Sequence, residues 1–221
     1  MRIVALSDTH GFHKRLQVPD GDLLIYGGDF SMRAKAHEVV EFAQWFKALP
    51  HPHKIFIAGN HDMACEGHDD WVKETFAPAI YLNHESCEVE GYRIFGSPFS
   101  SAIYDPSPWF FDYQRFGPRS QELWGAIPEY LDVLITHGPP YGLGDKVHEA
   151  HRGEDPHVGD LNLLNRVKSV LPRIHIFGHI HEGYGRYTID TWNYTRTTLF
   201  YNVCVCDGNY KPVNPITVID L

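Results

Sequence analysis

The sequence predicts an α/β fold in which two mixed sheets pack face to face with helices on the outside, a four-layer α/β/β/α sandwich. Two observations predict it. Short apolar runs that end in polar residues alternate with helical patterns in the first third of the chain, as buried strands and helices do. Strand-like runs with a hairpin pattern gather later, which is typical of a second sheet.

The early elements follow from the spacing of apolar residues. Helical spacing over 35–49 involves Ala36, Val39, Val40, Ala43 and Phe46, and Pro50 ends the pattern. A second helix is predicted over 69–76. The first strands are predicted at 3–6, 23–26 and 54–58.

The later elements are mostly strands. The run 85–95 alternates around Glu90-Gly91, which predicts a hairpin with its turn there. A helix is predicted over 161–171, where apolar residues recur at helical spacing. The remaining strands are predicted at 132–136, 173–177, 199–205 and 216–219.

Length and composition favour one domain over residues 1–221. The chain has 221 residues, 43% of them hydrophobic and 21% charged, without a low-complexity run. The apolar stretch 3–6 is too short for a signal peptide or a membrane span, so a cytoplasmic location without membrane attachment is expected. The four cysteines do not form a disulfide pattern, and Cys204 and Cys206 are expected to be buried on one face of a strand. The sequence does not specify an oligomeric state.

The charge balance bears on the partners. The formal net charge is −9, and the Lys and Arg residues are scattered, which argues against binding to long nucleic acids. An acidic chain that handles phosphate must neutralise it locally, and bound cations do this. The content of 15 histidines is consistent with bound metal cations.

Acid, amide or imidazole groups follow five of the predicted strands, and they are Asp8, His10, Asp29, Asn60, His61, His137, His179 and His181. Ligands gather beyond the carboxyl ends of strands in α/β sheets, so these residues are expected to converge. Mixed nitrogen and oxygen donors suit Mn²⁺ best here, or Fe or Zn, rather than Ca²⁺ or Mg²⁺. Two divalent cations roughly 3.5 to 4 Å apart would need a bridging carboxylate, and Asp29 is the candidate.

Each of these motifs has an ordinary structural explanation when taken alone. Asp8-Thr9-His10 is typical of a helix cap, Gly28-Asp29 of a turn, and His137 of a loop. The predicted metal site therefore depends on all five motifs occurring in order. The other histidines are expected to be solvated or packed, and they are His13, His37, His51, His53, His68, His84, His148, His151, His157 and His175. Asn193-Tyr194-Thr195 matches a glycosylation acceptor but is read as a turn.

The ordered motifs closely resemble those of the calcineurin-like metallophosphoesterases: Asp-x-His, Gly-Asp, Gly-Asn-His-Asp, a lone His and Gly-His-x-His. The resemblance implies the family's sandwich fold and a hydroxide that bridges two divalent metals. It assigns one metal to Asp8, His10, Asp29 and His181, and the other to Asp29, Asn60, His137 and His179. His61 would be a catalytic residue that faces the phosphate, with Asp62 as its supporting partner.

The resemblance extends over nearly the whole chain to the metallophosphoesterase-domain-containing subgroup, through 136–140, 177–185 and Asn214-Pro215. That subgroup includes cyclic-nucleotide phosphodiesterases, so a small phosphoester, possibly a nucleotide, is the expected substrate. Asp29 is followed by Phe30-Ser31-Met32-Arg33, unlike the pattern of protein serine/threonine phosphatases. The alternatives are a nuclease, a dinucleoside-polyphosphate hydrolase and a non-catalytic scaffold of the same fold.

Two long predicted loops, 97–118 and 139–159, are candidates for determining substrate specificity. The first is rich in aromatic residues, and the second carries Lys146, His148, His151 and Arg152. Trp109 either stacks on a nucleotide base or belongs to a loop that packs against the sandwich, and the sequence favours neither.

Overall fold

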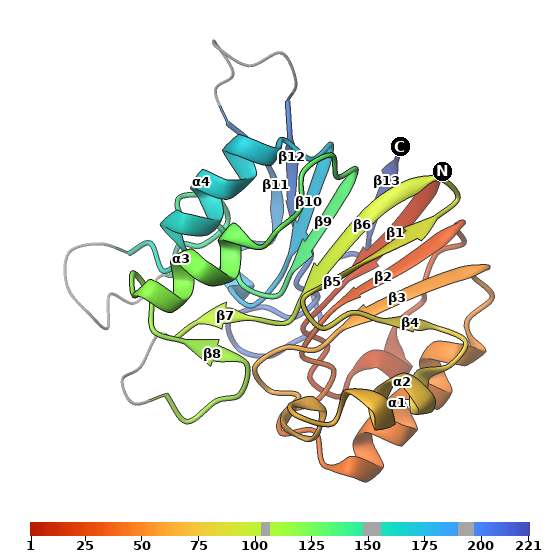
Figure 1. The fold of residues 1–221 in the computed structure, drawn as a ribbon. Coiled ribbons are helices and arrows are strands. Elements are labelled where there is room, and N and C mark those ends of the chain that lie inside the picture. The colour runs from red at the N-terminus through yellow and green to blue at the C-terminus, as the bar shows by residue number, and fades with distance from the viewer. Residues whose placement is uncertain (103–106, 148–155, 190–196) are drawn as a thin grey trace.

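The computed structural model describes residues 1–102, 107–147, 156–189 and 197–221. Its first sheet has the order β13-β1-β2-β3-β4, in which β1 to β4 are parallel and β13 is an antiparallel edge. These strands are β1 (Arg2–Leu6), β2 (Leu23–Gly27), β3 (His53–Ile57), β4 (Ile80–Tyr81) and β13 (Thr217–Asp220). Helices α1 (Ala36–Ala48) and α2 (Asp69–Phe76) cover its outer face (Figure 1).

The second sheet has the order β11-β12-β10-β9-β6-β5. Its strands are β5 (Glu85–Val89), β6 (Tyr92–Ser97), β9 (Val133–Thr136), β10 (Ile174–Phe177), β11 (Gly185–Thr188) and β12 (Leu199–Asn202). Helices α3 (Pro118–Gly125) and α4 (Leu161–Val170) lie on its outer side (Figure 1). The described residues also contain a small parallel pair, β7 (Ser100–Ser101) with β8 (Asp112–Tyr113), and the 3-10 turns η1 (His13–Arg15), η2 (Met63–Cys65) and η3 (His181–Gly183).

Alternating side chains divide the core into three layers. In β1, Ile3 and Ala5 face the second sheet, while Val4 and Leu6 face α1 and α2. Isoleucines and valines from both sheets fill the space between them, which is what parallel strands buried on both faces require. The four-layer sandwich predicted from the sequence is therefore confirmed.

The second sheet is mixed, as predicted: β6, β9, β10 and β12 run parallel, and the edge strands β5 and β11 pair antiparallel with their neighbours. Other predicted details were incomplete or wrong. Helix α3 was missed, although Pro118 at its first turn is a recognised start signal. The predicted loop 97–118 contains β7 and β8, and the strand predicted over 199–205 ends at Asn202.

Several sequence-based interpretations lie outside the described residues: those of His148, His151 and Arg152 in the second loop, and Asn193-Tyr194-Thr195. No described helix combines the length and apolar character that crossing a bilayer demands.

Candidate metal centre

The five predicted strand exits meet at one end of the sandwich. Exits from β1, β2 and β3 come from the first sheet, and exits from β9 and β10 come from the second. The two sheets are joined there, because Ser7 after β1 forms an isolated parallel bridge with Cys204 after β12. Three groups of possible ligand atoms, each within 4.8 Å of one another, lie at this junction: Asp8, His10 and His181; His10, Asp29 and His61; and Asp29, His137 and His179.

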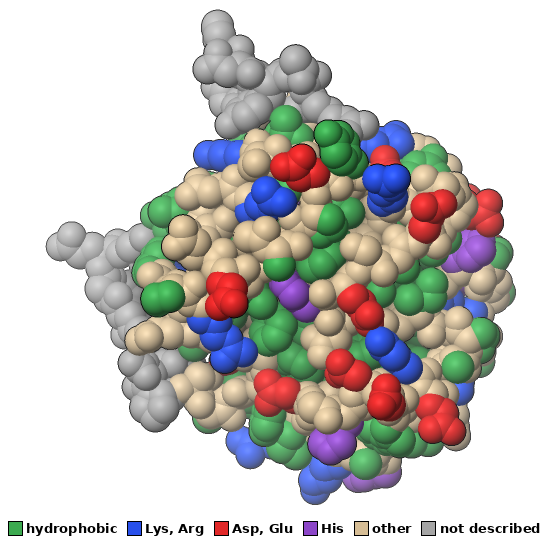
Figure 2. Space-filling view, in the orientation of Figure 1, with side chains coloured by type: hydrophobic (Ala, Val, Ile, Leu, Met, Phe, Trp, Pro, Cys, Tyr) green, Lys and Arg blue, Asp and Glu red, His purple; other side chains and the backbone are tan. Residues whose placement is uncertain are grey.

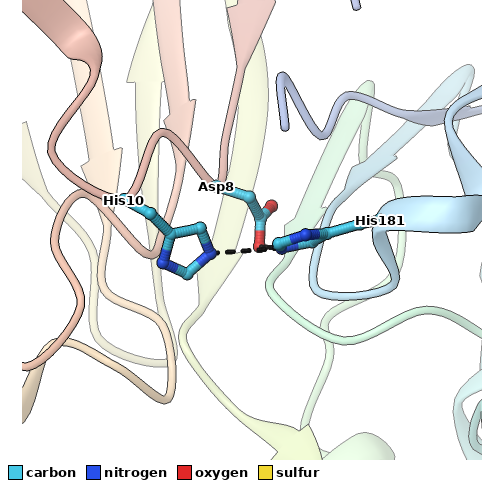
Figure 3. A group of neighbouring side chains, drawn as sticks. All are labelled: Asp8, His10 and His181. Carbon is cyan, nitrogen blue, oxygen red and sulfur yellow. Dashed lines mark hydrogen bonds and ion pairs between the residues drawn. The ribbon is translucent and has the colours of Figure 1, made fainter. Parts of the chain in front are cut away.

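The first group joins β1 to the turn after β10 (Figure 3). Nε2 of His181 lies 3.1 Å from Nε2 of His10 and 3.5 Å from Oδ1 of Asp8. Nδ1 of His181 donates to the carbonyl of Asp207 at 2.9 Å, so the lone pair of this imidazole is on Nε2 and points into the group.

The third group, Asp29, His137 and His179, joins the exit of β2 to those of β9 and β10, and Asn60 after β3 lies beside it. Oδ1 of Asn60 lies 2.9 Å from both Nε2 of His137 and Nδ1 of His179. Oδ2 of Asp29 is 3.3 Å from the same nitrogen of His137 and 3.9 Å from Nε2 of His10. Asp29 therefore lies between the first group and the rest of the third, the position expected of the predicted bridging carboxylate.

His61 belongs to the remaining group, with His10 and Asp29, but its side chain also has partners of its own. Its Nδ1 is 2.8 Å from the carbonyl of Met32, its ring stacks on Trp109 with centroids 4.1 Å apart, and it lies edge-on to His10. Its backbone N–H donates to Oδ1 of Asp29. The structure thus places His61 beside the predicted ligands, with one nitrogen bonded to the backbone.

Asp62 has a different partner from the expected one. Its carboxylate accepts from the backbone N–H groups of Asp29 and Gly59 at 2.8 Å and of Phe30 at 3.2 Å, and none of its hydrogen bonds in the described structure goes to the imidazole of His61. Asp62 therefore holds the exits of β2 and β3 together, and it supports Asp29 rather than His61.

The backbone at the site is unusual. Asp8, His10, Asp29 and His179 all have positive φ, between 43° and 68°. Non-glycine residues adopt this conformation at a cost, and it is concentrated at functional sites. Glycines leave room between them, since a Cβ on Gly178 would overlap Oδ2 of Asp8 and the hydroxyl of Ser7.

The comparisons with known proteins agree with these motifs. The family model for calcineurin-like phosphoesterases matches residues 1–183. The chain belongs to the calcineurin-like phosphoesterase family. It is 39% identical to human metallophosphoesterase domain-containing protein 1 over 247 residues, which covers 100% of this chain and 71% of the relative. It is 32% identical to the Caenorhabditis elegans UPF0046 protein C25E10.12, over 100% of this chain and 81% of that one.

A solved structure shows the same fold. The protein TT1561 of Thermus thermophilus superposes with a TM-score of 0.59 at 13% identity, over 99% of this chain and 98% of that chain. The predicted family resemblance is therefore confirmed, and membership assigns the chain to the metal-dependent phosphoester hydrolases.

The side chains of this phosphoesterase suit bound cations. His137 donates from Nδ1 to the carbonyl of Gly27, so its Nε2 lone pair faces the oxygens of Asn60 and Asp29. Lone pairs that converge in this way repel one another unless a proton or a metal ion lies between them. The donors are a mixture of nitrogen and oxygen, so the residues fit divalent metal ions.

The electrostatics point the same way. Burial alone would raise the pKa of Asp8 and Asp29, but neighbouring imidazoles, chiefly His181 and His137, hold both below their usual range. Burial lowers the pKa of His10 to about 4 and of His179 to about 3, which leaves both neutral at pH 7. Anionic carboxylates and neutral imidazoles are the forms that ligate metals. Burial opposes protonation of His137, yet Asp29 raises its pKa to about 10, so a cation arriving there would displace a proton.

Sequence reasoning missed two residues at this phosphoesterase site. The ring of Tyr210, from a turn near the C-terminus, lies 4.8 Å from that of His10 and 5.0 Å from that of His181. The thiol of Cys204 donates to Oδ2 of Asp8 at 3.1 Å, so this buried cysteine orients a predicted ligand as well as filling space. No motif marks either residue, because both follow strands of the second sheet whose ends the sequence did not define.

Proposed function

We propose that the protein hydrolyses small phosphate esters, with nucleotides such as cyclic AMP as the leading substrate class, by means of two divalent cations. One cation would be held by Asp8, His10, Asp29 and His181. The other would be held by Asp29, Asn60, His137 and His179. Mn²⁺ is the preferred metal for this donor set, with Fe or Zn as alternatives.

One observation carries the proposal: Asp29 lies between two ligand groups whose lone pairs converge. Bound divalent cations in such a site supply a hydroxide at neutral pH and screen the phosphoryl oxygens. Asn60 and the imidazoles orient the phosphate group, and burial keeps bulk water away from it.

His61 is the proposed acid. Its hydrogen bond to Met32 and its stack on Trp109 fix the ring beside both ligand groups. From there it donates a proton to the ester oxygen that leaves, a contribution typically of about 10²- to 10⁴-fold. Asp62 acts indirectly, by holding the backbone of Asp29.

The small-substrate part of the proposal is supported by the charge pattern. Figure 2 shows Lys and Arg side chains separated by Asp and Glu on the face in view, without a continuous basic stripe there. A long nucleic acid is recognised chiefly through such a stripe. The charge for a single phosphate would come from the cations themselves.

Chelation followed by addition of Mn²⁺ tests the function. We expect hydrolysis of cyclic nucleotides or aryl phosphodiesters to disappear on chelation and to return with Mn²⁺. His61→Ala should lower kcat by about 10²-fold or more, while two metal ions per chain are retained. His37→Ala, at an exposed position of α1, is the matched control.

Two outcomes would count against the proposal. A metal-loaded protein that hydrolyses none of the cyclic nucleotides, aryl esters or short oligonucleotides would be a scaffold. If His61→Ala instead loses a metal ion, His61 is a ligand and cannot be the acid.

A further inference from the structure

A pocket opens next to His61, and its chemistry differs from that of the metal site. Arg33, His61, Met63, Pro108, Trp109 and Phe110 line it. Its walls are therefore aromatic and apolar apart from one cation and the proposed acid. Only His61 among these side chains belongs to the three groups of possible ligand atoms, and none is a predicted metal ligand.

The pocket is anchored to the catalytic loops. The N–H of Phe110 donates to the carbonyl of Asn60 at 3.2 Å, and the N–H of Phe111 donates to Oε1 of Glu66 at 2.8 Å. On the opposite wall, the carbonyl of Met32, next to Arg33, pairs with Nδ1 of His61. Because both walls are tied to the site, the pocket keeps its position relative to His61.

Arg33 has no acidic partner in the described parts of the chain. Its guanidinium carbon lies 5.7 Å from the centre of the Trp109 ring, and none of the ion pairs among described residues involves it. An arginine that packs on an aromatic ring still presents its N–H edges to an acceptor. The side chain of Arg33 is exposed, so in the described structure its N–H groups remain available to an anionic ligand beside the site.

We infer that this pocket binds the leaving group of the ester, and that it selects leaving groups that are aromatic and carry a negative charge. Within the proposed class of small phosphate esters, this favours anionic aryl esters over cyclic nucleotides, whose leaving group is an uncharged ribose oxygen. The inference rests on the proposed function, because it uses His61 as the acid. When the bond between phosphorus and the leaving oxygen breaks, its electron pair stays on that oxygen, which takes the proton from His61. Water supplies the new oxygen on phosphorus and gives up a proton. The leaving group thus lies on the His61 side of the phosphate, where the pocket begins.

These contacts also limit how a nucleotide base could stack on Trp109. The ring of Trp109 already contacts His61 and Arg33, so the aromatic ring of a ligand would lie against Met63, Pro108 and Phe110 as well as the edge of this stack. Arg33 would then bind the anionic substituent through its N–H groups.

Two aryl phosphodiesters test the selection. Their phenols should have matched acidity, one neutral and the other carrying a carboxylate. Arg33→Gln should lower kcat/KM about 10-fold more for the carboxylated ester than for the neutral one, the loss that one charge-assisted hydrogen bond gives. Arg33→Lys should restore part of the difference, and Arg186→Gln on the edge strand β11 should leave the ratio unchanged. Equal losses on both esters would overturn the inference.

A binding measurement separates this inference from the proposed function. The protein loaded with diamagnetic Zn²⁺ is titrated with 4-hydroxybenzoate and with phenol, and binding is followed through the indole N–H resonance of Trp109. We expect the benzoate to bind more tightly than phenol, and Arg33→Gln to remove the difference. If the wild type does not distinguish the two compounds, the inference fails even where esters are hydrolysed. If the protein binds 4-hydroxybenzoate more tightly than phenol but hydrolyses no phosphate ester, the proposed function alone is overturned.

Discussion

At the scale of single residues, the site depends on backbone conformations that most side chains avoid. Four predicted ligands have positive φ, and each such residue costs about 1–3 kcal/mol unless its surroundings hold it. Hydrogen bonds offset part of this cost, since Asp62 accepts from the N–H of Asp29, and Asp8 accepts from the N–H of His179. The charged groups therefore fix the backbone that presents the ligands.

Gly178 allows this close packing, which leads to a prediction. In Gly178→Ala the new Cβ would overlap the carboxylate of Asp8, so this carboxylate must turn away from His181. We expect Mn²⁺ affinity to fall about 10-fold or more, as measured by competition with a chelator. Gly125→Ala, at the end of α3 where no atom lies within 4 Å of the added carbon, is the control. Unchanged affinity in Gly178→Ala would show that Asp8 is not a ligand.

At the scale of elements, strands β1, β2 and β3 of the first sheet were predictable because each is an apolar run followed within three residues by Asp or Asn, whereas the two-residue strand β4 was missed. The exits of β1, β2 and β3 needed only that pattern. Helix α3 and strands β7 and β8 are short and lie among aromatic residues, so no periodicity marks them. Their positions come from tertiary bonds, such as those of Asp160 with the hydroxyls of Tyr113 and Ser120.

The turn after Cys206 is an element that the sequence did not connect with the site. Asp207 accepts from the N–H groups of Asn209 and Lys211, and its own carbonyl accepts from Nδ1 of His181. The side chain of Asp207 thus shapes the turn that orients a predicted ligand, while the same turn carries Tyr210 against His10.

Asp207→Ala should loosen this turn without disturbing the core, because among the described residues the side chain accepts only from its own loop. We expect metal affinity to fall about 10-fold, as for other losses of groups that orient ligands, with little change in the melting temperature of the metal-free protein. Calorimetric titration with Mn²⁺ measures the first quantity and thermal unfolding the second. Asp20→Ala, in the loop before β2, is the matched control. A large drop in the melting temperature would mean that the turn supports the fold rather than the ligand.

At the scale of the whole molecule, the site lies where the two sheets meet, and neither sheet contains all of it. Asp8, Asp29 and Asn60 follow strands of the first sheet, whereas His137, His179 and His181 follow strands of the second. The order of the motifs predicted which residues would meet. It could not predict Tyr210, Cys204 or Arg33, because their neighbours depend on how the two sheets and their loops pack.

The core of the second sheet contains a histidine away from the metal site. His175 on β10 packs against Phe177 and Phe200, and its Nε2 lies 2.8 Å from the hydroxyl of Thr136. That hydroxyl donates to the carbonyl of Gly138, so the ring proton is on Nε2, and Nδ1 is buried without a partner. Burial lowers the pKa of His175 from 6.5 to about 3.

This histidine makes the stability of the whole protein depend on pH. Below pH 6.5 the unfolded chain takes up a proton at residue 175 that the folded chain does not accept until about pH 3. The free energy of unfolding should therefore fall with decreasing pH, by about 1.4 kcal/mol per pH unit from this group. His175→Gln lacks this titrating group, so its free energy of unfolding should not fall for this reason. If the variant is less stable than the wild type at pH 7.5, the difference between their free energies of unfolding should shrink by about 1.4 kcal/mol for each pH unit below 6.5. Urea denaturation of the metal-free proteins at pH 7.5, 6 and 5 measures the difference, in which the other titrating groups cancel. His37→Gln should run parallel to the wild type, and a parallel line for His175→Gln would mean that the folded core accepts the proton.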